Sequence, residues 1–357
     1  MNQMQHRYTV PLVEKTRGEL VETVHRGVIT IVSSDGEIRY SVGNPDFKTF
    51  LRSSAKPFQL LPTIESGAIK AYDLQDNEIA VMCSSHGGEE YHLRSVRQIL
   101  SKIGLDESAL DSGIHPPSDL SSHEAMIRKG QKPTAIHSNC SGKHAGILAL
   151  CQLKGFSTIG YTDQSHPAQQ LIKQTLSELA EAELSDADIA IDGCGVPTFA
   201  LPVWRIGLLF AKFATASTGG TNRQKALARI RDSMIKKPTY VSGSNRFCAK
   251  LTRHYPNQLV MKSGAEGVYG LGLAETGLGL GMKIETGASE PREISILETL
   301  RQLSQFDSIS MSSYLRQSFG CLSGQKPIYN FHKQNVGRTY PVFQLRSTTP
   351  KIKSHPF

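Results

Sequence analysis

The sequence predicts a mixed α+β protein of the broad α/β class, in which sheets are flanked by helices. The chain of 357 residues is 39% hydrophobic and holds 31 glycines, as expected for a globular protein of this class. Strand-like apolar runs also alternate along it with apolar residues at helical spacing. No long linker or internal repeat divides the chain, so we expect one domain over residues 1–345. A basic tail at 346–357 is expected to be mobile.

The first expected element is a β-hairpin, because residues 28–32 and 37–42 are strand-like and flank a Ser-Ser-Asp-Gly turn. Apolar residues at helical spacing predict helices around 93–103, 172–179 and 227–234. Pro291 near the start of the segment 289–303 predicts a further helix there. The glycine-rich run 264–281 includes strand-like pieces at 267–273 and 278–285. It has G-x-G-x-G but not G-x-G-x-x-G, so a dinucleotide site has little support.

Four short apolar runs lead directly into small polar residues. We expect strands at 79–82, 134–136, 189–191 and 259–261. They are followed by C-S-S-H-G-G, by H-S-N-C-S-G-K-H, by D-G-C-G-V-P and by K-S-G-A-E-G. Rigid elements that present polar, glycine-rich loops are a common way to build an enzyme site. This pattern favours a catalytic protein over a structural one.

Composition argues against several classes of partner. The net charge of +8 comes from dispersed basic residues, with one small cluster at 346–353 and no nucleic-acid-binding motif, so we do not expect nucleic acid as a partner. No segment is apolar enough to span a bilayer and the N-terminus has no apolar signal core, so we expect a cytoplasmic protein without membrane contact. The six cysteines lack a CxxC pair, which favours free thiols.

The octapeptide at residues 137–144, H-S-N-C-S-G-K-H, concentrates reactive side chains ahead of an apolar, helix-like stretch. Cys140 and Lys143 are three residues apart and would share one face of a helix. Two functional interpretations compete: Cys140 is a nucleophile beside a base, or Cys140 and Lys143 are metal ligands. The alternative is a polar turn with an incidental cysteine.

A second pattern is the S-x-x-K motif formed by Ser53 and Lys56. On one helix face the amine reaches the hydroxyl, and a lysine with a lowered pKa can take the serine proton. Pro57 requires this motif to lie in the first turn of a helix. Ser85 and then Lys262, in K-S-G, follow in an order that resembles the penicillin-binding proteins and serine β-lactamases.

Further candidate site residues lie outside the octapeptide but carry side chains that could act together with it. Cys194 in G-C-G would complete a zinc site with Cys140 and Lys143, because metal binding would displace the lysine proton. The alternative for Cys194 is a small buried thiol. Asp192 is a candidate anchor for a substrate ammonium group. His86, like the two histidines of the octapeptide, has either a substrate-positioning or a structural role.

Together, five segments resemble the rhizobial-type (class 3), thermolabile L-asparaginases over nearly the whole chain. They are 52–59, 83–89, 137–144, 192–197 and 262–267. The resemblance implies a homodimer with a fold akin to the serine β-lactamases, penicillin-binding proteins and glutaminases, and hydrolysis of L-asparagine to L-aspartate and ammonia through an acyl-enzyme. Residues 1–345 would then be its catalytic domain.

The resemblance also implies roles for single residues. Ser53 would be the nucleophile with Lys56 as its partner, and Ser85 with Lys262 a second pair. Zinc, held by Cys140, Lys143 and Cys194, would tune substrate binding.

Arg52 and Asp192 are expected to bind the α-carboxylate and the α-ammonium group of the substrate, and His86 to contribute to the same pocket. The segment 242–248 is less regular than the family pattern, so the pocket wall there is not predicted. The alternatives are a glutaminase, another serine-dependent amidase of β-lactamase-like fold, and a zinc-binding amino-acid sensor without turnover. Glutamine differs from asparagine by one methylene, which a pocket discriminates by about 1–3 kcal/mol.

Overall fold

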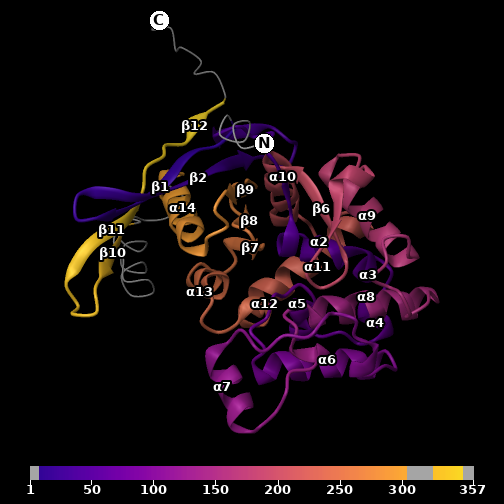
Figure 1. Ribbon diagram of the computed structural model, residues 1–357. Coiled ribbons are helices and arrows are strands. Elements are labelled where there is room, and N and C mark those ends of the chain that lie inside the picture. Colours follow the sequence, from indigo (N-terminus) through magenta and orange to yellow (C-terminus); the bar gives the residue numbers. More distant parts are fainter. Residues whose placement is uncertain (1–7, 304–324, 349–357) are drawn as a thin grey trace, which may run out of the picture.

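The computed structural model describes residues 8–303 and 325–348. Within these residues a large antiparallel sheet has helices on both faces, and a cluster of further helices lies beside it (Figure 1). The predicted mixed α+β class is confirmed. In the described part of the chain, no helix combines the length and the apolar character needed to cross a membrane.

The large sheet is built from segments at both ends of the described chain. Its strands are β1 (Val10–Arg17), β2 (Leu20–Val32), β3 (Ile38–Val42), β7 (Leu259–Ser263), β8 (Val268–Leu273), β9 (Gly279–Ile284), β10 (Lys326–Tyr329), β11 (Asn335–Pro341) and β12 (Arg346–Ser347). They run in the order β10-β11-β1-β2-β9-β8-β7, while β3 pairs with both β2 and β12. The predicted hairpin is confirmed as β2–β3, and the glycine-rich run supplies β8 and β9 as predicted.

The predicted tail begins on this sheet. Arg346 lies opposite Ser41 and Ser347 opposite Tyr40, so β12 is an added strand at the edge of β3. The first residues of the tail are therefore paired rather than free. Residues 349–357, which carry the rest of this prediction, lie outside the described residues.

The helices include every long helix that the sequence predicts. They are α2 (Lys56–Gln59), α3 (Leu61–Glu65), α4 (Ala68–Ala71), α5 (Asp76–Met82), α6 (Glu90–Lys102), α7 (Leu120–Arg128), α8 (Ser141–Lys154), α9 (Pro167–Ala180), α10 (Val203–Ala214), α11 (Asn222–Lys236), α12 (Pro238–Ser242), α13 (Phe247–His254) and α14 (Ser289–Gln302). The predictions for 93–103, 172–179, 227–234 and 289–303 are confirmed by α6, α9, α11 and α14. A small sheet, β4 (Lys48–Phe50), β6 (Pro197–Pro202) and β5 (Ile189–Ile191), lies beside α9 and α10.

Two of the four short strand predictions are wrong. Residues 79–82 belong to α5, where Gln75 and Glu78 form a capping box, and residues 135–137 form the 3-10 helix η3 (Ala135–His137). Apolar runs of three or four residues are compatible with a helix or a strand, so the capping residues determine that these segments are helical. The runs 189–191 and 259–261 are strands as predicted.

The glycine-rich run allows α10 to pack directly on the sheet. A Cβ atom at Gly279 would lie 2.0 Å from the Gly207 carbonyl oxygen, and one at Gly281 would lie 2.2 Å from the Val203 carbonyl oxygen. The G-x-G-x-G pattern thus serves helix packing, since only glycine permits such an approach. The helix α10 lies between the sheet and the helical cluster, while α13 and α14 cover the opposite side (Figure 1).

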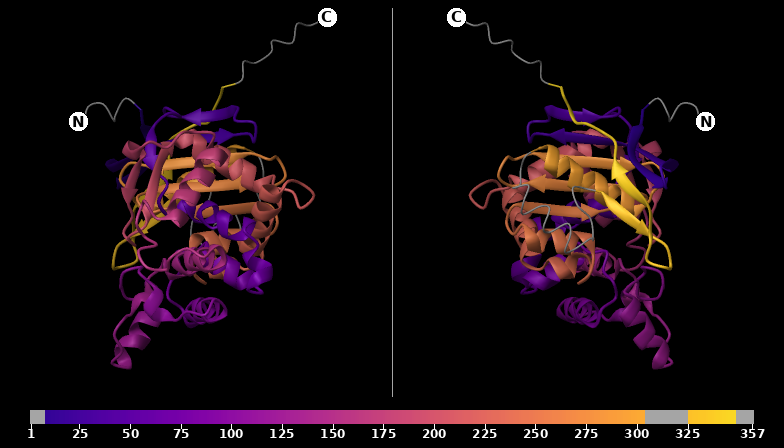
Figure 2. Two further views of the ribbon diagram at one scale, coloured as in Figure 1. Left: turned by 90° about the vertical axis from the view of Figure 1, so that its right-hand side faces the viewer. Right: turned by 90° about the vertical axis from the view of Figure 1, so that its left-hand side faces the viewer.

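The alternation of side chains along β7 points Lys262 toward the helical cluster. In β7, Val260 belongs to the apolar core of the cluster, whereas Met261 belongs to the core on the other face. Side chains two apart on a strand point the same way, so Lys262 follows Val260 into the cluster. Lys262 is buried there, and Figure 2 shows α7 projecting from the end of the body.

Candidate active site

The centre of the site is the Ser85 hydroxyl, which lies between two lysine amines. Lys56 Nζ and Lys262 Nζ are each 3.0 Å from Ser85 Oγ. Both lysines are buried, with 1% of their surface exposed. Lys56 comes from α2, Ser85 from the segment after α5 and Lys262 from β7, so three elements that are distant in sequence meet at one oxygen.

Burying two amines this close together affects their protonation. Burial, and then the charge of Lys56, lower the pKa of Lys262 to about 7 from its ordinary value of 10.5. Further hydrogen bonds from the amines go to the carbonyl oxygens of Ser84 and Ser263. At neutral pH Lys262 can therefore be uncharged and accept the proton of a hydroxyl group.

Ser53 lies one turn before Lys56, in the 3-10 helix η1 (Arg52–Ala55) that leads into α2. Pro57 occupies the first turn of α2, as the S-x-x-K interpretation requires. The Lys56 amine bonds to Ser85 and makes no hydrogen bond with Ser53 in this structure. Arg52 has a positive φ of 50°. This uncommon backbone conformation at a non-glycine residue directly precedes the candidate nucleophile.

Ser53 and Ser85 open onto the same cavity, which has a volume of about 410 Å³. Pockets of about 300–1,000 Å³ are typical of small-molecule sites. The segment 242–248, whose place in the pocket the sequence leaves undetermined, contributes to the wall. The lining residues are Ser53, Ser85, Ser118, Asn139, Ser242, Arg246, Phe247, Cys248, Ser263, Gly264, Ala265, Glu266, Gly287, Ser289, Arg292 and Glu293.

The octapeptide forms the start of α8, with Cys140 as its N-cap residue. Gly142 allows this turn to approach α5, because a Cβ atom there would lie 2.1 Å from the Val81 carbonyl oxygen. Lys56 Nζ lies 3.2 Å from Cys140 Sγ, which connects the octapeptide to the two lysines. The structure therefore places the two sequence motifs side by side.

Cys140, Lys143 and Cys194 lie together, as the sequence-based metal prediction requires. Lys143 Nζ lies 2.8 Å from Cys194 Sγ. A hydrogen bond from Cys194, followed by the charges of Lys56 and Lys143, outweighs burial and holds the pKa of Cys140 well below its ordinary value. The proton shared with Cys140, and then burial, raise the pKa of Cys194. Cys140 Sγ also lies 3.0 Å from Asn139 Oδ1, to which its thiol donates.

This donor set suits zinc, although it depends on an unusual ligand. Within residues 8–303 and 325–348, no three histidine, cysteine, aspartate or glutamate side chains are grouped so as to hold a metal. In a zinc site built from these residues, the Lys143 amine would be the third donor beside the two sulfurs. Burial lowers its pKa, but the sulfurs of Cys140 and Cys194 outweigh this and raise it. A bound metal would replace the protons that now join these three groups.

The predicted substrate anchors Arg52 and Asp192 bind each other. Arg52 Nε donates a hydrogen bond to Asp192 Oδ1 at 2.8 Å, and neither residue lines the cavity. Burial raises the pKa of Asp192, but Lys143 and Arg52 outweigh it and hold that pKa below its ordinary value. This pair lies beside the sulfur cluster formed by Cys140, Lys143 and Cys194. Arg52 directly precedes Ser53 in the chain.

His86 is buried behind the cavity wall. Its Nε2 lies 2.9 Å from Ser141 Oγ, which donates to the Ile136 carbonyl oxygen, so Nε2 is the donor of this contact. Its Nδ1 has no hydrogen-bond partner among the described residues. Burial lowers the pKa of His86 well below its ordinary value. A neutral His86 held by α8 suits a structural role, and it does not line the cavity.

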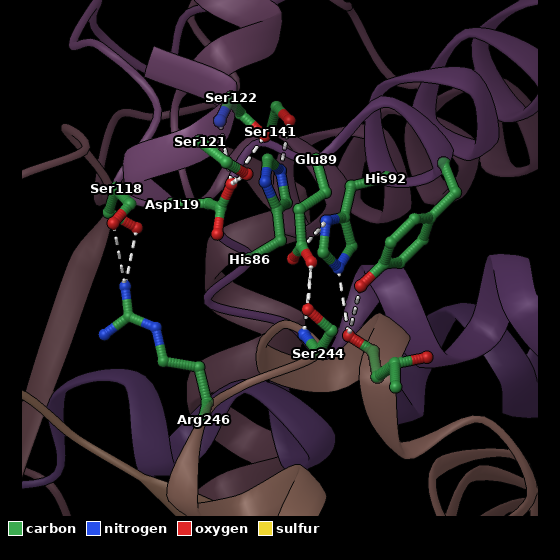
Figure 3. A network of polar contacts seen from close by, with 12 residues as sticks. His86, Glu89, His92, Ser118, Asp119, Ser121, Ser122, Ser141, Ser244 and Arg246 are labelled. Carbon is green, nitrogen blue, oxygen red and sulfur yellow. Dashed lines mark hydrogen bonds and ion pairs between the residues drawn. The ribbon is translucent and has the colours of Figure 1, made fainter. Parts of the chain in front are cut away.

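A polar network fixes the segment 242–248 in place (Figure 3). Glu89 accepts hydrogen bonds from the backbone N–H and the hydroxyl of Ser244, at 3.2 and 2.6 Å. Arg246 donates to Ser118 Oγ at 2.8 Å. His92, stacked on His86, bonds to the Thr239 carbonyl oxygen. Figure 3 shows the side chains of His86, Glu89 and His92 on one side of this network and those of Ser244 and Arg246 facing them.

The sequence did not reveal Arg246, Arg292 and Glu293 as cavity residues. They lie before α13 or in α14, and no motif surrounds them. Their only sequence signal is the irregular segment 242–248, which contains Arg246. Charged residues near the start of a helix are common, so the other two could not be singled out.

Solved structures and a family model match the chain. No curated protein matches the chain. The crystal structure of Mglu in its glutamate form is 13% identical, with a TM-score of 0.36, and the match covers 79% of this chain and 63% of that one. The structure of Mglu in its native form is also 13% identical, with a TM-score of 0.34, and that match covers 83% of this chain and 65% of the Mglu chain. The chain thus spans less than two thirds of the length of these Mglu chains.

The family comparison covers most of the sequence. A family model described as L-asparaginase II matches residues 13–340, which include the candidate residues of the site. This confirms the family to which the five sequence segments point. The chain belongs to the L-asparaginase II family.

Proposed function

We propose that this protein is an amidohydrolase that converts L-asparagine to L-aspartate and ammonia. The observation that carries the proposal is the Ser85 hydroxyl, 3.0 Å from each of two buried amines in a cavity shared with Ser53. Serine hydroxyls activated by lysine amines perform acyl transfer. Membership of the L-asparaginase II family supports an amide as the substrate.

In the proposed mechanism Ser53 is the nucleophile and Ser85 a proton relay. Ser53 Oγ attacks the side-chain amide carbon and gives its proton to the two lysines that share Ser85, of which Lys262 has the lowered pKa. The tetrahedral intermediate collapses as ammonia leaves, protonated through Ser85 and Lys262. Water then attacks the aspartyl ester, gives a proton back through the same lysines and releases L-aspartate. The contacts of Ser85 with both amines suit the relay, while Ser53 faces the cavity without a bond to Lys56.

We also propose that Cys140, Lys143 and Cys194 hold zinc. The contact of Lys143 with Cys194 and the lowered pKa of Cys140 support the assignment. When bound, zinc supplies a positive charge that attracts the polar groups of the substrate. These three residues would hold the ion near Ser53, while the lysines and serines carry out the proton transfers.

The experiment is ammonia release from L-asparagine and L-glutamine by the wild-type protein and by Ser53→Ala and Ser85→Ala. We expect release from asparagine, and a loss of at least about 1000-fold in kcat in each variant, because either change removes a group that acts as a unit with the lysines. Ser101→Ala, at an exposed position of α6, is the matched control and should keep full activity.

The outcomes separate the alternative functions. Faster turnover of glutamine than of asparagine would make the protein a glutaminase. No ammonia from either amide would contradict the proposal and favour an amino-acid sensor that binds zinc. The homodimer and the cytoplasmic location implied by the resemblance stay predictions, and sedimentation and cell fractionation would test them.

A further inference from the structure

We propose that Arg292 and Glu293 bind the charged head group of the amino-acid substrate. The guanidinium takes the α-carboxylate, and the Glu293 carboxylate takes the α-ammonium group. This inference rests on the proposed function and adds the residues that select a free amino acid. Both side chains line the cavity onto which Ser53 and Ser85 open. One cavity therefore holds the reactive hydroxyls and a pair of opposite charges.

Arg292 is a buried cation with unused hydrogen-bonding capacity. Its side chain is 10% exposed. Nη1 donates to the Gly264 carbonyl oxygen at 3.2 Å, while Nε has no hydrogen-bond partner in the described chain. A guanidinium has five N–H donors in a planar fork that matches a carboxylate. The nearby Glu293 Oε1 is 3.7 Å from Nη2, too far for a hydrogen bond.

Glu293 complements this cation. Burial raises the pKa of its carboxyl group, against the opposing charges of Arg292 and Lys326. Its ion pair with Arg292 is long, at 3.7 Å. A bound ammonium group would offset the cost of holding a partly buried carboxylate. An amino-acid head group supplies one charge of each sign, so it matches two neighbouring opposite charges better than a simple anion or cation does.

The alternative head-group site is the predicted pair Arg52 and Asp192. Those two side chains are already joined at 2.8 Å and do not line the cavity. Binding a head group there would require that bond to break. Arg246 also lines the cavity, but among the described residues no ion pair joins it to a carboxylate, so it does not provide the two opposite charges that Arg292 and Glu293 provide. Arg292 and Glu293 can bind the head group without breaking a hydrogen bond between them. This difference favours them over Arg52 and Asp192 as the head-group site.

Three amides test the assignment: L-asparagine, succinamate, which lacks the ammonium group, and β-alaninamide, which lacks the carboxylate. We expect Arg292→Gln to lower kcat/KM for asparagine and succinamate about 10- to 100-fold, mainly through KM, and to leave β-alaninamide nearly unchanged. Glu293→Gln should instead affect asparagine and β-alaninamide and spare succinamate. Arg292→Lys should restore part of the loss, because it keeps the charge without the fork.

Matched controls lie on the same helix. Arg301→Gln and Glu290→Gln replace residues of α14 that are paired with Glu298 and Lys326 and do not line the cavity, and should leave all three amides unaffected. For an amide that turns over slowly, calorimetric affinities measured on Ser53→Ala should show the same pattern. The calorimetric comparison also avoids effects on the chemical step.

Each other outcome overturns the assignment. Equal losses for all three amides would show that Arg292 only supports the Gly264 loop. No loss for any of them would show that the pair does not contact substrate, and the same selective pattern in Arg52→Gln and Asp192→Asn would move the head group to that pair. In these cases asparagine hydrolysis by the wild-type protein still stands. No ammonia from any amide would overturn the proposed function and this inference together.

Discussion

At the scale of single residues, the proposed chemistry depends on the protonation of the two lysines at Ser85. They lie within 3.0 Å of the same oxygen, away from water, and like charges at this separation repel. The pKa of Lys262, about 7, is the clearest sign of this. A buried amine that is neutral at physiological pH is more useful as a base than as an ion-pair partner.

This pKa predicts the pH dependence of activity. The folded chain loses the Lys262 proton near pH 7, so kcat/KM should rise with pH through about 7 and level off above it. Lys262→Met should lower kcat/KM about 100- to 10,000-fold and remove this rise. Lys236→Met, at an exposed position of α11, is the control. A profile that stays flat from pH 6 to 9 in the wild-type protein would contradict the assignment of Lys262.

The same group predicts how stability changes with pH. Its pKa is about 7 when folded and close to 10.5 when unfolded, so the unfolded chain binds an extra proton between these values. Stability should therefore rise with pH from about 7 to 10.5 more steeply in the wild-type protein than in Lys262→Met. Urea unfolding of both proteins at pH 7 and pH 9 measures the difference. Parallel changes in the two proteins would show that Lys262 keeps an ordinary pKa.

At the scale of elements, glycine packing decides how close the helices come to the sheet. A Cβ atom at Gly279 would lie 2.3 Å from the backbone nitrogen of Ala211 in α10. Gly279→Ala should lower the free energy of unfolding by about 1–3 kcal/mol, because neither backbone can yield. Gly219→Ala, where the nearest atom is 3.8 Å away, should change it little. Equal midpoints of urea unfolding for the two variants would contradict this packing.

The elements also show which parts of the fold the sequence can predict. The helices α6, α9 and α11 bury apolar residues at regular spacing, so their periodicity identifies them. The segments before Ser85 and before Cys140 are too short for periodicity to separate a helix from a strand. Their structure follows from packing and caps, such as the capping box of Gln75 in α5.

For the candidate site, the sequence motifs identify residues that the structure brings close together. Ser53, Lys56, Ser85 and Lys262 stand out by spacing and order, and the structure places them around one cavity or behind its wall. Arg292 carries no motif because its place at the cavity depends on how α14 packs against β1, β9 and β11. The pairing of Arg52 with Asp192 is likewise a tertiary contact, between residues 140 apart in the chain.

At the scale of the whole molecule, the site joins distant parts of the chain. The sulfur cluster joins α8 to the turn between β5 and β6, since Lys143 and Cys194 are 51 residues apart. Any ligand that bridges these parts binds the folded chain and not the unfolded one. Metal binding should thus stabilise the protein as a whole.

Zinc should therefore raise the melting temperature of metal-free protein. At a free concentration 100 times the Kd, the gain is about 2.7 kcal/mol. Cys140→Ser, Lys143→Met and Cys194→Ser should each abolish the shift. Cys151→Ser, a buried cysteine of α8 outside the cluster, should keep it even if its own melting temperature falls. A shift that persists in all three ligand variants would place zinc elsewhere.

The central claim is a serine nucleophile served by the two buried lysines. Its most direct test is acid quenching of the wild-type protein during turnover of L-asparagine, followed by peptide mass mapping. The account predicts an aspartyl ester on Ser53 that is absent from Ser53→Ala. An adduct on Cys140 or Ser85, or turnover by Ser53→Ala at the wild-type rate, would contradict it.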